Sequence, residues 1–241
     1  DTSSLPKAEK SPIAATPELP LAYRALQKIP NTRIDLTAEG EIEVVSLTSN
    51  RATDETLQLL DGLTHLKNLA LGSNQITDAG LVNLKGLINL QMLRLGQPFL
   101  SSPSSHACSK VTDAGLVHLK ELINLQTLSL AHTQVTDTGL VHLTELTNMK
   151  ELWLYGTQIT DAGLVHLKGL TKLQELHLNE TKVTDAGLTH LKDLTNLQTL
   201  NLRFTQVTDA GLVHLKGLTN LRYISLGGNQ ITDAGLVHIK G

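Results

Sequence analysis

Residues 197–220 read LQTLNLRFTQVTDAGLVHLKGLTN, and close copies of this unit recur along most of the chain. The first part of the unit alternates apolar and polar residues with period 2, which indicates a short strand. The second part places leucines at helical spacing. Thr208 or Asp209 is positioned to cap the helical segment, and Gly217 to end it. Each unit therefore predicts one short strand followed by one short helix.

The repeats follow one another at a regular interval. They begin at Ile42, Leu66, Leu90, Leu125, Met149, Leu173, Leu197 and Leu221. The step is 24 residues everywhere except from Leu90 to Leu125, where it is 35. One strand and one helical turn cannot bury the apolar positions of a unit alone, whereas stacked neighbours bury them in a continuous core. We therefore expect an α/β solenoid, with parallel strands on the concave face and short helices on the convex face.

The pattern LxxLxLxx(N/T)x(I/V)TDAGLxxLxxLxx resembles the leucine-rich repeat over residues 42–241. Its ITDAGL half is similar to the cysteine-containing subclass and to bacterial proteins built from TDAGL repeats. The resemblance implies a horseshoe-shaped binding scaffold, and it does not name a ligand. The chain departs from the cysteine-containing subclass at the place after each strand. That place holds Asn50, Asn74, Pro98, Thr133, Thr157, Thr181, Thr205 and Asn229.

Outside the regular repeats, three segments have their own character. Residues 1–19 are rich in Ser, Pro and Ala, which is typical of a flexible tether. Residues 20–41 predict a capping helix over 21–29 and the start of a hairpin around the turn TAEG. An insertion at about 96–110 interrupts the repeats of 42–241, and the last repeat is truncated, which favours a fragment of a longer array.

The insertion holds two features that could touch a ligand or do chemistry. Phe99 and Leu100 could contact a ligand at the concave rim, or the Ser-rich segment could be a mobile loop. His106 and Cys108 suggest a base and a nucleophile, but no third group is in view to orient them. We therefore expect Cys108 to be inert.

Composition excludes several classes of protein. The chain has 241 residues, a net charge of −3 and 40% apolar residues, which excludes a disordered polar chain and a strongly basic nucleic-acid binder. No apolar run approaches the roughly 18 residues of a membrane span. A single cysteine excludes an internal disulfide framework. The absence of an initiating Met and the Ser/Pro-rich start favour a secreted or cell-envelope protein, with a cytoplasmic one left open.

In a repeat protein, the residues that differ from one repeat to the next lie at strand positions that point away from the core. The last four repeats hold four of the six aromatic residues at such places. Trp153 and Tyr155 are two apart on one strand and should emerge about 7 Å apart. Trp153 should lie between Ser129 and His177 of the neighbouring strands, with Ser129 and Ala131 leaving room beside the two rings. Exposed aromatic rings with polar neighbours suit a protein hot spot or the apolar face of a sugar. The candidate ligand-binding residues are Glu151, Trp153, Tyr155, Glu175, His177, Asn179, Asn201, Arg203, Phe204 and Tyr223.

Glu151 and Glu175 occupy the same place in adjacent strands, so their carboxylates could approach to about 5 Å, the spacing of retaining glycosidases. That chemistry requires the carboxylates to flank a bond inside a pocket, whereas these two share an open face. Lys150 and Arg203 could offset their charge. Glycan hydrolysis is therefore the weakest of the functions considered, and we expect no enzyme.

Two columns of polar residues on the helical side resemble metal sites. His118, His142, His166, His190, His214 and His238 recur in register, but repeats on the convex side are too far apart for the ligands of one zinc ion. The aspartates at the start of the helical segments lie where they can cap each helix. Those aspartates are Asp54, Asp78, Asp113, Asp137, Asp161, Asp185, Asp209 and Asp233. We expect no metal and no cofactor.

These observations favour a non-enzymatic recognition scaffold that binds a protein or a glycan on the concave face of repeats five to eight. The alternative is a structural or self-assembling segment of a larger protein, acting through an open C-terminal edge. Neither hypothesis involves nucleic acid.

Overall fold

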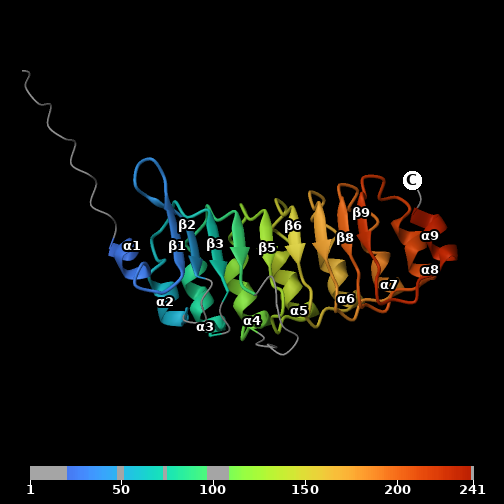
Figure 1. Cartoon of the computed structure of the whole chain (residues 1–241), viewed down its shortest axis with the longest axis horizontal. Coiled ribbons are helices and arrows are strands. Elements are labelled where there is room, and N and C mark those ends of the chain that lie inside the picture. Colours follow the sequence, from blue (N-terminus) through green and yellow to red (C-terminus); the bar gives the residue numbers. More distant parts are fainter. Residues whose placement is uncertain (1–20, 48–51, 73–74, 97–108, 240–241) are drawn as a thin grey trace, which may run out of the picture.

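The computed structural model describes residues 21–47, 52–72, 75–96 and 109–239. These residues form one nine-stranded sheet in which the strands follow in sequence order, with short helical segments along its other side (Figure 1). The predicted solenoid of parallel strands and short helices is thereby confirmed. The sheet is open, because its first and last strands do not pair with each other.

The strands are short, and eight of them run parallel. Their bounds are β1 Thr32–Leu36, β2 Ile42–Leu47, β3 Asn68–Leu71, β4 Met92–Arg94, β5 Thr127–Ser129, β6 Glu151–Trp153, β7 Glu175–His177, β8 Thr199–Asn201 and β9 Tyr223–Ser225. Strands β2 to β9 pair in parallel in one unbroken register, including the pair β4–β5 on either side of the insertion.

Each repeat adds one turn of α-helix, in most repeats continued by one turn of 3-10 helix. The α-helices are α1 Leu21–Leu26, α2 Asp54–Gln58, α3 Asp78–Leu81, α4 Asp113–Leu116, α5 Asp137–Leu140, α6 Asp161–Leu164, α7 Asp185–Leu188, α8 Asp209–Leu212 and α9 Asp233–Leu236. The 3-10 turns are η1 Val82–Leu84, η2 Val117–Leu119, η3 Val141–Leu143, η4 Val165–Leu167, η5 Val213–Leu215 and η6 Val237–Ile239.

A helix and a hairpin precede the parallel part of the sheet. Strand β1 pairs antiparallel with β2, and Gly40 makes the turn between them with a left-handed φ of 85°. Leu26 of α1 is fully buried in the core. The helix ends at Leu26, three residues short of the range that the spacing of apolar residues predicts.

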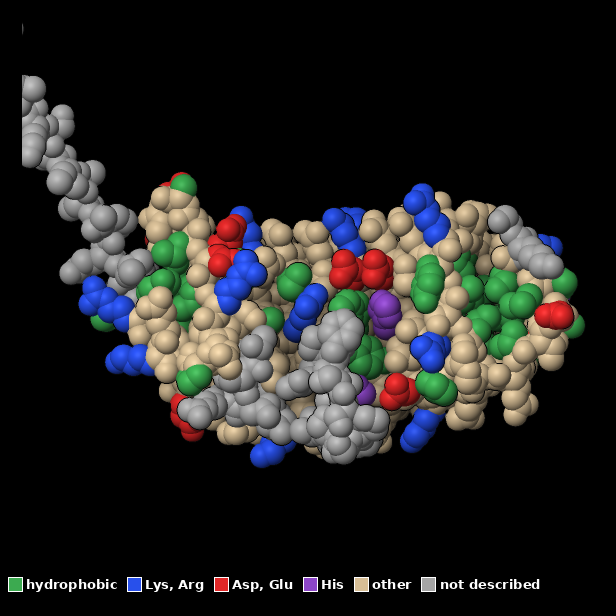
Figure 2. Space-filling model, viewed as in Figure 1, with side chains coloured by type: hydrophobic (Ala, Val, Ile, Leu, Met, Phe, Trp, Pro, Cys, Tyr) green, Lys and Arg blue, Asp and Glu red, His purple; other side chains and the backbone are tan. Residues whose placement is uncertain are grey.

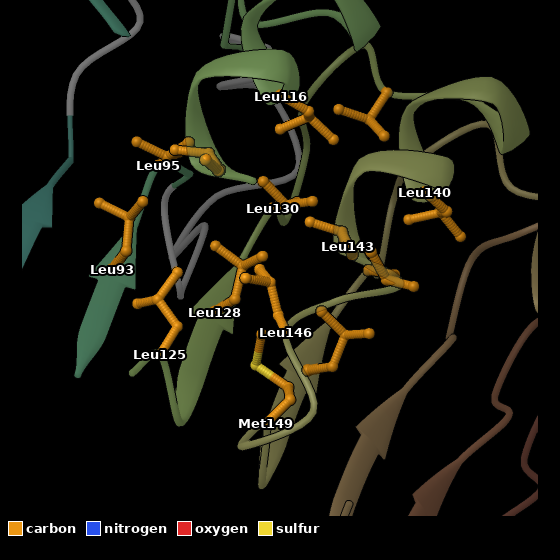
Figure 3. Packing of buried hydrophobic residues seen from close by; sticks show 14 of the residues in the cluster. Leu93, Leu95, Leu116, Leu125, Leu128, Leu130, Leu140, Leu143, Leu146 and Met149 are labelled. Carbon is orange, nitrogen blue, oxygen red and sulfur yellow. The ribbon is translucent and has the colours of Figure 1, made fainter. Parts of the chain in front are cut away.

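The core is a continuous column of leucines between strands and helical segments. Figure 3 shows Leu93, Leu128 and Leu130 from the strand side approaching Leu116 and Leu140 from the helical side. All five are completely buried. Because every repeat contributes the same set, each repeat covers the apolar face of its neighbour and none has a separate core.

The aspartate that opens a helical segment binds the next repeat. The Asp137 carboxylate accepts hydrogen bonds from the Thr160 N–H at 2.8 Å and the Thr160 hydroxyl at 2.6 Å, across one repeat boundary. The same pair of bonds links Asp54–Thr77, Asp78–Thr112, Asp113–Thr136, Asp161–Thr184, Asp185–Thr208 and Asp209–Thr232. We call these contacts the aspartate ladder.

The aspartate ladder corrects the prediction that each aspartate caps its own helix. The capping residue is the threonine: the Thr208 hydroxyl accepts from the Ala210 N–H, whereas the Asp209 carboxylate turns to Thr232 of the following repeat. Sequence reasoning left Thr208 and Asp209 open as caps, and the structure selects Thr208. The aspartates therefore hold neighbouring repeats together.

The glycine of each TDAG sequence makes room for this carboxylate. A Cβ atom at Gly163 would collide with the Asp137 carboxylate of the preceding repeat, and the same holds at Gly187 and Asp161. Gly217 is different, because no atom lies near its Cβ position and its φ is not left-handed. The helical segment ends at Leu215 with Lys216 as its C-cap, so it stops just before Gly217 as predicted, without a left-handed glycine.

Threonine replaces cysteine after several strands without leaving its hydroxyl unpaired. Thr133 and Thr181 are buried, and each hydroxyl donates to the carbonyl three residues earlier, Leu130 O and Leu178 O. At the last of these turns, Asn229 instead accepts from the Thr205 N–H at 2.8 Å. Small polar side chains thus stabilise these turns at the ends of their strands.

Replacing Gly163 by Ala should lower the free energy of unfolding by about 1–3 kcal/mol, because the new methyl group displaces the Asp137 carboxylate. The matched control is Gly217→Ala, whose Cβ lies in open space and which should be neutral or slightly stabilising. Urea unfolding followed by circular dichroism measures both. Equal effects of the two substitutions would contradict the steric role of Gly163.

The aspartate ladder should also make stability depend on acid. Burial raises the pKa of Asp113, but hydrogen bonds from Thr136 and Thr138 outweigh it and leave that pKa below its usual value. A carboxyl whose pKa is lower when folded stabilises the fold above its unfolded pKa and loses that contribution as pH falls through the folded pKa.

We therefore expect the free energy of unfolding to fall between about pH 5 and pH 2. Asp113→Asn should be less stable at pH 7 and should lose less stability over that range. Urea titrations at five pH values make the comparison. A variant with the same acid dependence as the wild type would show that Asp113 takes no part.

Candidate functional site

The end residues of five adjacent strands form a row across the concave face. Register pairs Arg94 with Ser129, Ser129 with Trp153, Trp153 with His177, and His177 with Asn201. Leucines precede these residues in each strand and point into the core, so the row projects from the opposite face. The predicted position of Trp153 between Ser129 and His177 is thereby confirmed.

The indole of Trp153 lies between a cation and an imidazole. The Arg94 guanidinium carbon is 5.0 Å from the centroid of the Trp153 ring. On the other side, the His177 ring centroid is 5.4 Å away, and the two ring planes meet at 65°. We call Arg94, Trp153 and His177 the stacked row.

The space beside Trp153 is occupied, contrary to the prediction that small residues leave it open. Arg94 stands two strands away, so its side chain must cross β5 to reach the indole. Ser129, which lies between them, has none of its surface exposed. A cation–π contact, rather than empty space, therefore lies on the Ser129 side of Trp153.

Four buried polar atoms of the row have no hydrogen-bond partner among the described residues. They are Arg94 Nε, Ser129 Oγ, Trp153 Nε1 and His177 Nε2. Buried polar groups are usually paired, because each one left unpaired costs about 1–3 kcal/mol. Four such atoms on four consecutive strands mark this place as one where stability is given up.

His177 connects the stacked row to two carboxylates. Its Nε2 lies 3.6 Å from Glu175 Oε2, which is too long for a normal hydrogen bond. Burial lowers the pKa of His177, and the nearby carboxylates of Glu175 and Glu151 offset part of that effect. The neutral imidazole is thereby favoured at neutral pH.

Glu151 and Glu175 are direct neighbours in register on β6 and β7. Figure 2 shows acidic side chains side by side next to a histidine near the middle of this face. Among the ion pairs of the described residues, Lys150 and Arg203 pair with neither carboxylate. The prediction that those two cations offset the acidic charge therefore does not rest on direct ion pairs, and it stays a prediction.

Tyr155 lies beside the row, next to a second histidine. Its ring meets His132 edge to face, with centroids 5.0 Å apart. A Cβ atom at Gly156 would collide with the His132 ring, so glycine at that place makes room for the imidazole. Burial raises the pKa of Tyr155 to about 12, with Arg94 opposing and Glu180 adding to the shift, so its phenol is a neutral hydrogen-bonding group at physiological pH.

The remaining predicted residues form a separate group nearer the C-terminus. Arg203 lies 5.2 Å from the ring of Phe204, and its backbone N–H donates to Asn201 Oδ1 at 3.1 Å. Phe204 has a left-handed φ of 54° and packs on Gly228, where a side chain would not fit. Phe204 and Tyr223 are 55% and 58% exposed, so they are accessible to a partner.

The structure thus divides the predicted set. Glu151, Trp153, Glu175 and His177 come together around the stacked row. The C-terminal group is Asn201, Arg203, Phe204 and Tyr223. The backbone carbonyl of Asn179 accepts from the Gly156 N–H at 3.1 Å.

Sequence reasoning missed Arg94 and a polar groove. Arg94 occupies the same place in its repeat as Trp153, which is the signal that identifies it. The groove, of about 550 Å³, runs along the edge where the strands begin. Its lining is Thr37, Glu39, His65, Lys67, Asn89, Gln91, Asn124, Gln126 and Asn148.

Metal chemistry finds no support in the described ranges. Within them, no group of three His, Cys, Asp or Glu side chains is arranged to hold a metal ion. His190, in the convex column, has a pKa lowered by burial and by Lys168. The insertion residues Phe99, Leu100, His106 and Cys108 lie outside the described residues, as do residues 1–19.

Comparison with known proteins identifies the family. Leucine-rich repeat families match residues 62–85 as a single repeat, and 123–164, 147–193, 171–212 and 195–238 as paired repeats. None of the curated proteins compared with the chain matches it. Among the part of the chain that the structure describes, no helix is long and apolar enough to cross a bilayer.

The solved structures that are similar to this chain include the following two. Internalin C2 from Listeria monocytogenes is 33% identical, with a TM-score of 0.63, over 83% of this chain and 77% of that one. The leucine-rich repeat ectodomain of the plant receptor kinase GASSHO1/SCHENGEN3 from Arabidopsis thaliana, solved in complex with CASPARIAN STRIP INTEGRITY FACTOR 2, is 19% identical. Its TM-score is 0.54, over 85% of this chain and 27% of that one. The chain belongs to the leucine-rich repeat family.

Glu175→Gln should move the pKa of His177 further below its ordinary value, because the carboxylate that favours the imidazolium is gone. Glu151→Gln should cause a smaller fall. NMR titration of the imidazole signals measures both, with His177→Asn assigning the resonance among ten histidines. A rise of the His177 pKa in Glu175→Gln would contradict this account of the site.

Proposed function

We propose that this chain is a non-enzymatic recognition scaffold that binds a protein on its concave face, across strands β4 to β8. The single observation that carries the proposal is the stacked row. Arg94, Trp153 and His177 are held in contact on a sheet face, with the Arg94 and Trp153 donors buried and unpaired. Trp, Tyr and Arg are the residues enriched where protein partners gain most of their binding energy.

The scaffold supports this function by fixing the row before a partner arrives. Its residues belong to consecutive hydrogen-bonded strands above a fully buried leucine layer. A surface that is rigid in the free protein loses little conformational entropy on binding, so more of the contact energy appears as affinity. The open C-terminal group around Phe204 extends the same face and supplies further exposed apolar area.

Family membership supports a binding role. The Arabidopsis ectodomain was solved with a bound factor, so the fold carries a partner in that protein. For this chain we propose a protein ligand, and we place its work in the cell envelope or outside the cell. The proposal assigns no catalytic role to Glu151 and Glu175, because they share an open sheet face and do not flank a pocket.

The direct test is a binding screen of the full chain against a panel of extracellular protein domains and a glycan array. Trp153→Ala combined with Tyr155→Ala should weaken any protein hit about 30-fold or more, because hot-spot truncation costs about 2 kcal/mol or more per site. Biolayer interferometry measures the affinity, and calorimetry the thermal transition.

The control is Val141→Ala combined with Val165→Ala, two exposed positions on the helical side, which should leave binding unchanged. Hits confined to the glycan array would contradict a protein ligand. A protein hit that the Trp153 and Tyr155 variant binds as well as wild type does would contradict the assigned surface.

A further inference from the structure

Two adjacent carboxylates point outward from the concave side of the sheet, and no lysine or arginine of the described residues forms an ion pair with them. Glu151 and Glu175 lie directly opposite each other on β6 and β7, where like charges destabilise a sheet. Among the described residues, the one basic side chain within ion-pairing distance of either carboxylate is His177. Burial lowers the pKa of its imidazole and keeps it largely neutral. The free protein therefore holds two adjacent negative charges that it does not neutralise.

A second, independent feature lies two residues further along β6, at Trp153, and on the two preceding strands, β4 and β5. Trp153 Nε1 and Arg94 Nε are buried hydrogen-bond donors without an acceptor, and the completely buried Ser129 between them has an unpaired hydroxyl. These groups require acceptor oxygens, whereas the glutamate pair requires a cation. A single ligand that satisfies both must carry the two kinds of group side by side.

We propose that the ligand presents a lysine or arginine side chain to Glu151 and Glu175, with a backbone carbonyl of the same residue or its neighbour on Trp153 Nε1 and Arg94 Nε. This inference rests on the proposed function and names the chemistry of the protein that the face receives. The occupant is a basic segment of polypeptide that crosses the strands.

The dimensions of the site match one long basic residue. Positions 151 and 153 lie two apart on one strand, which is about 7 Å. A lysine or arginine stem covers a similar span, so its methylene groups can lie over the part of the Trp153 side chain that stays exposed while the charged end reaches the carboxylates.

Other occupants fit less well. An acidic segment would be repelled by the glutamate pair. A neutral glycan supplies hydroxyl oxygens for the donors and nothing for the two charges. A metal ion would find two carboxylates, and the described residues offer no group of three side chains able to hold one.

The test uses phage-displayed random twelve-residue peptides panned on the full chain. Peptides whose binding is lost in the Trp153→Ala, Tyr155→Ala variant are then synthesised. We expect them to share a lysine or arginine. Replacing that residue by glutamine should weaken binding to wild type about tenfold or more, and binding to Glu151→Gln, Glu175→Gln by less than twofold.

The matched control is Glu145→Gln with Asp193→Asn, which removes two exposed carboxylates next to helical segments and gives the same change in net charge. It should bind the basic peptides as wild type does. Folding of both double variants is checked by their thermal midpoints, and the concave pair should hold or raise it because a repulsion is removed.

Three results would overturn the inference. Trp153-dependent peptides without a common basic residue would refute it and leave the proposed function standing. So would loss of basic peptides in the control variant, because that would show attraction to net charge alone. A screen in which no peptide and no protein depends on Trp153 would refute both proposals.

Discussion

The structure depends on one repeated contact, the aspartate ladder, in which a carboxylate accepts two hydrogen bonds from the threonine of the next repeat. Leucine packing alone is non-directional, so it does not determine how far one repeat is rotated or shifted against the next. Two short bonds to one carboxylate do. The adjacent glycine completes the contact, since any side chain there would occupy the place of the carboxylate. The TDAG sequence therefore determines how neighbouring repeats stack more than it determines where the helices form.

Correct stacking is what joins separate repeats into one continuous concave face. The residues of the stacked row are up to 83 positions apart in sequence, as from Arg94 to His177, yet they lie within four consecutive strands, β4 to β7. A small change of register at any boundary would separate the Arg94 guanidinium from the Trp153 ring. The scaffold can therefore keep unpaired donors and two adjacent carboxylates on its face, because the leucine core and the aspartate ladder supply the stability that these groups give up.

The sequence predicts the fold well because a 24-residue period constrains every copy alike. The strands, the helical segments and the neighbours of Trp153 all follow from the alignment of repeats. Contacts between neighbouring repeats are harder to predict from the sequence. Every repeat contains both contacting residues, so the repeat pattern does not show whether a residue contacts its own repeat or the next one. Asp209 was for that reason assigned to its own helix instead of to Thr232. Arg94 was overlooked because its reach across β5 depends on side-chain conformation, which repeat spacing does not encode.

The most direct measurement is the NMR signal of the indole N–H of Trp153, the only tryptophan in the chain. Its donor is buried and unpaired in the free protein. If the stacked row is the recognition surface, saturation with a bound protein partner moves this signal downfield and slows its exchange with water, as an acceptor takes the proton. A complex in which the indole signal keeps its free position and exchange rate would contradict the account.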